Sequence, residues 1–296
     1  MHILMTGGTG LIGTAACAAL HAAGHKLTIL TRRARPATTE ATYITSLGEC
    51  ADRVDVVINL AGAGLADKRW SSAYKRQIVS SRVDLTRELV VWMSELEQPP
   101  KRLISASAIG YYGAADEQTF TEGAGVGTGF SAALCQSWEE EAGRAVALGT
   151  QVCLLRFGVV LAREGGALGK MTQSFRLGVE TWLGSGEQWL SWIHVDDAVR
   201  VIQHVLAQEC PAGAYNTVAP EPARHREFAH EAGRQSKTWL KLGVPAIAAR
   251  LMAGEMAEEL LLSGQRVLPS QLLEDGFQFH YPTLNEALKN LIPGKG

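Results

Sequence analysis

The sequence predicts an α/β protein with a doubly wound parallel sheet of the Rossmann type, followed by a smaller, mostly α-helical C-terminal region. Three observations lead to this fold class. A glycine-rich turn follows the first apolar run, apolar runs alternate with helical patterns up to about residue 105, and the elements after residue 165 are shorter. We expect a first domain over residues 1–165, whose core takes back segments around 190–220, and a second region over residues 166–296.

The glycine-rich turn joins the first expected strand, at residues 3–5, to a helix of period 3.6 that ends near Gly24. It fits G-x-G-x-x-G from Gly8 and G-x-x-G-x-x-G from Gly7. A pyrophosphate binds to backbone N–H groups at such a helix N-terminus, where side chains on the turn would hold it away. The turn thus predicts dinucleotide binding; the alternative is a turn that binds nothing. The expected cofactor-binding residues are Thr6, Gly7, Gly8, Thr9, Gly10, Leu11, Ile12 and Gly13.

Two arginines follow the second expected strand, at residues 27–30. Folds specific for NAD place an acidic side chain about 20 residues after the glycines, where it holds the ribose hydroxyls. This chain has Thr31, Arg32 and Arg33 there. Guanidinium groups pair with a 2′-phosphate and cannot accept the hydroxyl hydrogens of a free ribose. We therefore predict NADP (NADPH) as the cofactor, with a solvated basic turn as the alternative.

The next elements complete the sheet. A continuous apolar run at residues 55–60 is typical of a parallel strand buried on both faces. It ends at Leu60 and continues into Ala61 and Gly62, where the backbone can pass under a cofactor. A ligand is expected at the carboxyl ends of the strands. The other elements expected here are strands at 43–45 and 102–105 and a helix at 68–93.

The later elements are read in the same way. Asp196 is expected to cap the N-terminus of a helix at 198–206. We interpret the neighbouring His194 as a structural hydrogen-bonding residue; the alternative is a ligand or a base. The other expected elements are strands at 152–161 and 277–279, and helices at 171–177, from 245, and at 257–262, 269–274 and 283–291.

Composition excludes several classes of partner. The chain has 296 residues, of which 46% are hydrophobic and 20% charged, and its net charge is −2. Because no block of like charges occurs, we expect no nucleic-acid or membrane partner. No apolar run is long enough to span a bilayer, the N-terminus does not resemble a signal peptide, and the 5 cysteines form no C-x-x-C. We expect a cytoplasmic protein, monomeric or homodimeric, and no metal site, since the histidines lack ligand spacing.

The whole chain resembles the extended short-chain dehydrogenase/reductase superfamily of the sugar-nucleotide epimerase type. The resemblance is carried by TGGTGLIG, INLAG, SASAIGYYG and WIHVDDAVRVI in this order. Within the superfamily, ADKRW, SRVD, GYYG and GEMAEELLLSGQRVLP are similar to an atypical epimerase family branch with its own small C-terminal domain. This resemblance implies an NADP-dependent oxidoreductase or epimerase. Its substrate is expected to be a small polar molecule, nucleotide-linked ones included.

The resemblance also implies individual site residues. It adds Arg82, within SRVD, and Gly158 to the cofactor-binding residues, Gly158 standing where related enzymes usually have Pro or Asn beside the nicotinamide. It aligns Ser107 with the Ser or Thr that hydrogen-bonds the substrate oxygen. Related enzymes then supply Tyr-x-x-x-Lys on the next helix, where the Tyr acts as acid or base.

The sequence departs from the family at this last motif. Residues 130–140 contain neither Tyr nor Lys. Tyr111 and Tyr112 are the nearest phenols, and we predict that one of them is the catalytic acid or base; the alternative is an aromatic lid that shapes the pocket. The missing motif also favours a rival function, an NADP(H)-binding sensor or assembly factor without chemistry.

Overall fold

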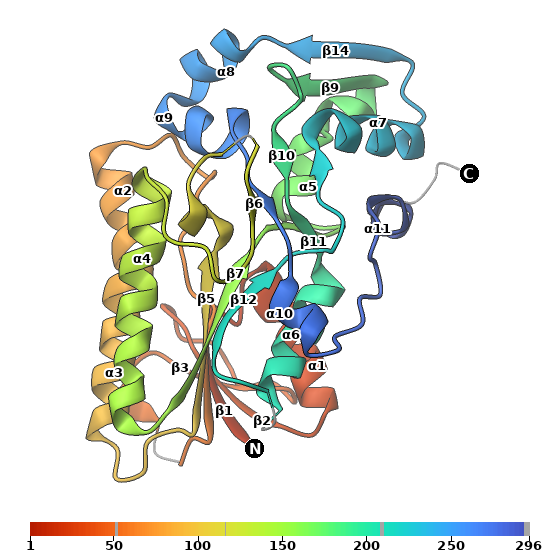
Figure 1. Ribbon diagram of the computed structural model, residues 1–296. Helices are drawn as coiled ribbons and strands as arrows, with labels where there is room; N and C mark the ends of the chain where they lie inside the picture. The colour runs from red at the N-terminus through yellow and green to blue at the C-terminus, as the bar shows by residue number, and fades with distance from the viewer. Residues whose placement is uncertain (51–52, 116, 208–209, 293–296) are drawn as a thin grey trace.

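A seven-stranded sheet forms the centre of the molecule (Figure 1). The computed structural model describes residues 1–50, 53–115, 117–207 and 210–292. The central strands are β1 (His2–Thr6), β2 (Lys26–Leu30), β3 (Thr42–Ile44), β4 (Val56–Asn59), β5 (Arg102–Ala108), β7 (Gln151–Phe157) and β12 (Gly213–Thr217). Their order is β12-β7-β5-β4-β1-β2-β3, and all neighbours are parallel. The predicted parallel sheet is confirmed.

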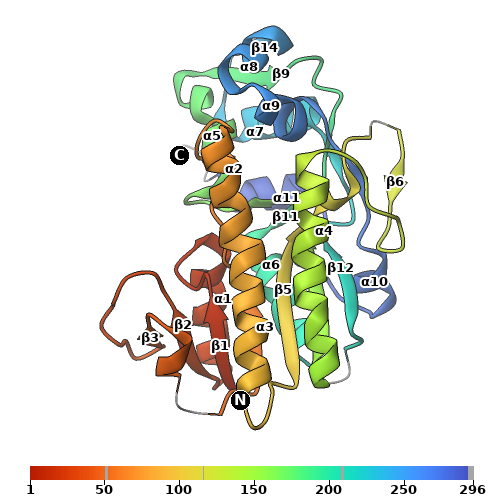
Figure 2. The ribbon, with the colours of Figure 1, turned by 90° about the vertical axis from the view of Figure 1, so that its left-hand side faces the viewer.

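Helices cover both faces of this sheet. They are α1 (Leu11–Ala22), α2 (Ser72–Val79), η2 (Ser80–Asp84), α3 (Leu85–Glu95), α4 (Phe130–Gly143) and α6 (Val195–Leu206). Figures 1 and 2 show α3 and α4 on one face, and α1 and α6 packed together on the other. Side chains alternate along a strand, so Ile3 and Met5 pack in a different core from Leu4, which lies in the core of α3. The sheet is therefore doubly wound.

Several expected elements differ in the structure. No strand forms at residues 277–279, and the strand expected at 152–161 is divided at Gly158 into strands at 151–157 and 159–161. The helix expected at 68–93 begins at Ser72, because the Ser71 side chain accepts a hydrogen bond from the Tyr74 N–H and caps the helix there. A π-helical turn, η2, interrupts it. The strand expected to end at residue 105 continues to Ala108, so Ser107 lies within β5.

The cap of α6 also differs from the expectation. The helix begins at Val195, and its N-cap is His194 rather than Asp196. His194 Nδ1 accepts the hydrogen bond of the Asp196 N–H at 3.0 Å, and Nε2 lies 3.2 Å from Asn290 Oδ1. An imidazole nitrogen thus takes the role expected of the carboxylate, and His194 is structural.

Residues 166–190 and 225–262 of the C-terminal region lie above the carboxyl ends of the central strands, whereas residues 270–274 pack beside β12 (Figure 1). The region's parallel pair of β9 (Val179–Leu183) and β14 (Leu240–Val244) stands beside short helices. Residues 195–217 return to the first layer as α6 and β12. Among the described residues, no helix combines the length and apolar character needed to cross a bilayer.

The remaining elements are short connections and the helices of the C-terminal region. The 3₁₀ and π-helical ones are η1 (Leu47–Glu49), η3 (Ile109–Tyr112), η4 (Arg144–Leu148), η5 (Gln173–Leu177) and η6 (Glu258–Leu262). The α-helices are α5 (Gly166–Met171), α7 (His225–Ser236), α8 (Ala246–Ala253), α9 (Glu255–Ala257), α10 (Ser270–Glu274) and α11 (Leu284–Leu291). The strands are β6 (Thr119–Phe120), β8 (Val159–Leu161), β10 (Trp189–Leu190), β11 (Trp192–His194), β13 (Ala223–Arg224) and β15 (Arg266–Val267).

Candidate functional site

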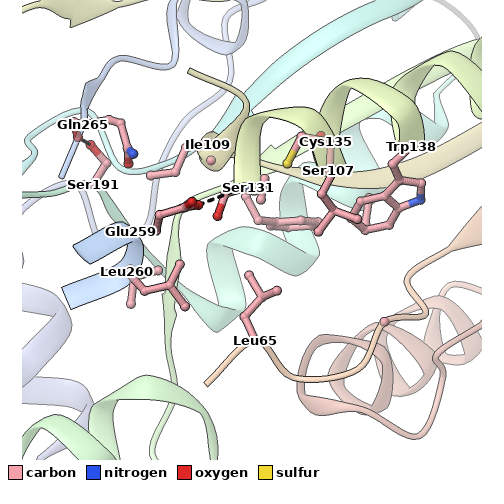
Figure 3. Close-up of a pocket in the computed structure, with 18 of the residues that line it drawn as sticks. Leu65, Ser107, Ile109, Ser131, Cys135, Trp138, Ser191, Glu259, Leu260 and Gln265 are labelled. Atoms are coloured by element: carbon pink, nitrogen blue, oxygen red, sulfur yellow. Dashed lines mark hydrogen bonds between the residues drawn. The ribbon is translucent and has the colours of Figure 1, made fainter. Parts of the chain in front are cut away.

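A cavity of about 340 Å³ opens at the carboxyl ends of β4, β5 and β7 (Figure 3). Its walls come from segments far apart in sequence: residues 60–62 after β4, 106–110 at the end of β5, the first turns of α4, residues 189–191, and residues 259–265 of the C-terminal region. Of the expected site residues, it brings together Leu60, Ala61, Gly62, Arg82, Ser107 and Gly158.

The glycine turn lies beside this cavity, at the carboxyl end of β1. Gly7 has φ +68, and a Cβ there would lie 2.5 Å from the Leu60 carbonyl carbon. A Cβ on Gly13 would lie 2.1 Å from Gly7 O. Because Gly7 and Gly13 carry no side chain, the turn can pack directly against the end of β4 and against α1.

The turn leaves the N-terminus of α1 open to a ligand. Gly10 is the N-cap and supplies no side-chain hydrogen bond to the first turn. Thr9 and Gly10 are exposed, and Leu11 and Ile12 are half-buried. Thr6 lies below, with its hydroxyl donating to Asn59 Oδ1 at 2.7 Å, which ties β1 to β4. Open N–H groups at the positive end of a helix dipole fit a pyrophosphate.

The arginine turn after β2 is exposed. Thr31 Oγ1 donates to Arg33 O at 2.8 Å and so fixes its shape. Arg32 and Arg33 are exposed, and within the described ranges neither has an acidic side chain within salt-bridge distance. Both guanidinium groups are thus available for an external anion.

Arg82 gives one end of the cavity a positive charge. Its guanidinium carbon lies 5.3 Å from the Trp138 ring centroid. Among the described residues, Nη1 donates to two uncharged oxygens, Ile78 O at 3.4 Å and Ser81 Oγ at 3.5 Å. Burial lowers the pKa of Arg82 from its ordinary value. A half-buried cation with such weak partners favours an anionic ligand at this end.

A buried chain of polar side chains ends at Ser107. The Ser107 hydroxyl, on a residue 3% exposed, donates to Glu139 Oε1 at 2.6 Å. Glu139 in turn binds Arg156 through two hydrogen bonds of 2.8 Å, from Nε to Oε1 and from Nη2 to Oε2. Burial opposes the charge of Arg156, but hydrogen bonding and attraction to Glu139 raise its pKa above the ordinary value. The carboxylate therefore points the Ser107 hydrogen away from the cavity and leaves the oxygen lone pairs for a ligand.

A catalytic tyrosine would have to reach the cavity with its hydroxyl, and the structure places Tyr111 and Tyr112 elsewhere. Neither is among the described residues that line the cavity. Tyr112 is 3% exposed, and its hydroxyl donates to Asn216 Oδ1 at 2.6 Å; burial raises its pKa. The Tyr111 ring lies 3.7 Å from the Arg156 guanidinium carbon. This geometry disfavours Tyr112 as a proton donor to a ligand in the cavity, and the role of Tyr111 stays a prediction.

Several residues of the site were not found from the sequence. Glu139 and Arg156 meet across α4 and β7, and the one available signal was a charged residue inside the apolar run at 152–161. Ser131 and Glu259 line the cavity from α4 and η6. Cys135 lies beside Ser107, and burial raises the pKa of its thiol to about 11. This thiol is therefore protonated at neutral pH and unreactive.

Comparison with known families gives two matches. Residues 3–217 match the NAD dependent epimerase/dehydratase family, and residues 244–291 match a domain of unknown function, DUF1731. The chain is 40% identical to Epimerase family protein Mb2239 of Mycobacterium bovis over 290 residues, which are 97% of this chain and 96% of that protein. It is 33% identical to Epimerase family protein SDR39U1 of Homo sapiens over 99% of this chain and 100% of that protein.

Solved structures agree with these matches. The crystal structure of human epimerase family protein SDR39U1 (isoform2) with NADPH is similar with a TM-score of 0.89 and 31% identity, over 99% of each chain. That of the nucleoside-diphosphate sugar epimerase from Corynebacterium glutamicum has a TM-score of 0.78 and 27% identity, over 99% of this chain and 58% of that one. The resemblance expected from the sequence motifs is confirmed.

Proposed function

Because this chain belongs to the NAD dependent epimerase/dehydratase family, we propose that it is an NADP-dependent oxidoreductase or epimerase acting on a small polar substrate. The observation that carries the proposal is the buried chain of polar side chains that ends at Ser107, on the wall of a cavity beside the segments expected to hold the cofactor. Nucleotide-linked molecules belong to the substrate class that we propose.

The proposed cofactor-binding residues lie in three places, and each place binds a different part of the cofactor. The turn from Thr6 to Gly13 receives the pyrophosphate at the N-terminus of α1. Thr31, Arg32 and Arg33 receive the 2′-phosphate. The two guanidinium groups are suited to it, because they are exposed and have no acidic partner within the described ranges. Residues 60–62, Arg82 and Gly158 line the cavity where the nicotinamide end is expected. The NADPH bound to the similar human protein supports the preference for NADP.

The chemistry proposed for the chain's own residues is a proton transfer. When bound, the cofactor would exchange a hydride with a substrate carbon. In the oxidative direction, the substrate hydroxyl donates to Ser107 Oγ; its proton passes to Ser107 as the Ser107 proton passes to Glu139, and the carbon gives up the hydride. In the reductive direction both movements reverse. Arg156 holds the Glu139 carboxylate in place for this exchange.

A screen with a matched set of variants tests the proposal. NADPH is incubated with aldehydes and ketones, and NADP with alcohols and sugar nucleotides, while the nicotinamide absorbance is followed. Ser107→Ala and Glu139→Gln should lower any turnover by about 10²–10⁴, the usual contribution of a positioned acid or base. Their affinity for NADPH should stay within threefold of the unmodified chain, which separates chemistry from cofactor binding. If both variants turned over substrate as fast as the unmodified chain, the assigned proton path would be contradicted.

One observation favours a second candidate, an NADP(H)-binding sensor or assembly factor. α4 carries neither Tyr nor Lys, and both tyrosines of η3 lie outside the described lining of the cavity. This candidate expects tight NADPH binding without absorbance change for any compound in the panel. It also expects Ser107→Ala to leave every measurable property unchanged.

A further inference from the structure

We propose that the N-terminus of α4, together with Ser131, forms an anion subsite for the substrate, and that the protein's own Glu259 fills this subsite until an acidic group of the ligand displaces it. The inference rests on the proposed function and narrows it, because it requires a substrate that carries a phosphate or carboxylate group. Ser131 and Glu259 line the same cavity as Ser107, so one ligand in this cavity can contact both places.

The first observation is a carboxylate seated on backbone amides (Figure 3). The Phe130 N–H donates to Glu259 Oε1 and the Ser131 N–H donates to Oε2, both at 2.8 Å. These N–H groups belong to the first turn of a 14-residue helix, where the dipole is positive. Glu259 thus occupies the position of an external anion at a helix N-terminus.

The chain leaves space for this anion. Gly129, directly before α4, has φ +103, and a Cβ there would lie 3.0 Å from Glu259 Oε1. A side chain at this position would therefore press against the bound oxygen, and would also be strained by the backbone. Gly129 and the two amides form a cradle shaped for anionic oxygen.

Ser131 is the independent observation that points to a ligand. The residue is 8% exposed and lines the cavity, yet Ser131 Oγ has no hydrogen-bond partner in the described part of the protein. Buried hydroxyl groups are normally hydrogen-bonded, because an unpaired one loses its bonds to water. A phosphate would supply a third oxygen for this hydroxyl, beside the two that the amides bind.

The Glu259 carboxylate is held weakly enough for a ligand to displace it from the N-terminus of α4. It is carried by η6, none of whose five residues is buried. Within the described ranges, no lysine, arginine or histidine lies within salt-bridge distance of its carboxylate. In the described part of the protein, the hydrogen bonds of this carboxylate are the two from the Phe130 and Ser131 amides. A group with more charge than a carboxylate, such as phosphate, competes with it for the same donors.

The test measures binding of inorganic phosphate, with acetate as the carboxylate probe, by calorimetry at constant ionic strength and saturating NADPH. Glu259→Ala should bind phosphate at least tenfold more tightly than the unmodified chain, which corresponds to about 1.4 kcal/mol. Glu258→Ala is the matched control, because it removes the same charge from the exposed neighbour on η6 and should bind phosphate as the unmodified chain does. A stronger gain for phosphate than for acetate identifies a phosphorylated ligand, and the reverse identifies a carboxylate.

Ser131→Ala, made in the Glu259→Ala background, should weaken phosphate binding threefold to tenfold. Equal phosphate affinity in Glu259→Ala and Glu258→Ala would overturn the proposal, as would an unchanged affinity after Ser131→Ala. If Glu259→Ala does not fold, Glu259→Gln replaces it and should still gain phosphate affinity over Glu258→Ala. Phosphate binding is measured without turnover, so its failure refutes the anion subsite and leaves the hydride-transfer proposal standing. Phosphate binding without turnover of any compound refutes the hydride-transfer proposal and leaves the anion subsite standing.

Discussion

Gly10→Val should abolish NADPH binding while leaving the fold intact. Gly10 has φ −85 and ψ −178, a conformation that valine adopts readily. A Cβ at this position meets only Gly7 O, at 3.3 Å. The branched side chain therefore extends over the open N-terminus of α1, where we propose that the pyrophosphate binds, and blocks it without disturbing the core.

The magnitude follows from linkage. At an NADPH concentration of 100 times Kd, binding stabilises the unmodified chain by about 2.7 kcal/mol, or roughly 5–10 °C in Tm for a chain of this size. Gly10→Val should show no such gain. Without cofactor its Tm should change little, since the weaker N-cap and the less flexible unfolded chain oppose each other at about 0.5–1 kcal/mol each.

Thermal melts with and without NADPH provide the assay, and Gly13→Ala is the matched control. A Cβ on Gly13 would lie 2.1 Å from the backbone oxygen of Gly7, so this variant should lose roughly 3 kcal/mol of stability without any cofactor present. A cofactor-dependent rise in Tm for Gly10→Val would refute the placement of the pyrophosphate. A normal melt for Gly13→Ala would refute the close approach of the turn and α1.

Three further outcomes are expected. Arg32→Asp should remove a preference for NADPH over NADH of at least tenfold, about 1.4 kcal/mol, in calorimetric titrations; equal affinities in the unmodified chain would contradict the choice of NADP. In single-turnover assays Tyr111→Phe should retain the rate that Glu139→Gln loses, whereas the reverse result would return the proton transfer to the phenol. Burial lowers the pKa of His225 from 6.5 to about 4, so the unfolded chain binds a proton that the folded chain does not. Stability should fall between pH 6.5 and 4, by about 2 kcal/mol at pH 5, and His225→Gln should remove this share of the loss in urea titrations.

The sequence by itself determined the sheet and the glycine-rich turn that joins β1 to α1. Their signals lie between neighbouring residues: apolar runs of strand length, the period of α1, and glycines at spacings that only a tight strand-to-helix turn requires. The basic turn at Thr31, Arg32 and Arg33 belongs to the same class, because its residues are adjacent in the chain. The local pattern did not place the helix boundary, because the Ser71 side chain caps α2 and the helix begins at Ser72, four residues later than expected.

The tertiary structure alone decided the chemistry of the cavity. Ser107 and Glu139 are 32 positions apart, and Ser131 and Glu259 are 128 apart, so no local pattern reports that they meet. Tyr112 is close to Ser107 in sequence, yet packing turns its hydroxyl to Asn216. Propensity and periodicity act over a few residues, whereas the hydrogen-bond partner of a buried polar group depends on how whole layers pack. The contacts of Ser107 and Ser131 therefore exist only once the sheet, α4 and the C-terminal region have come together.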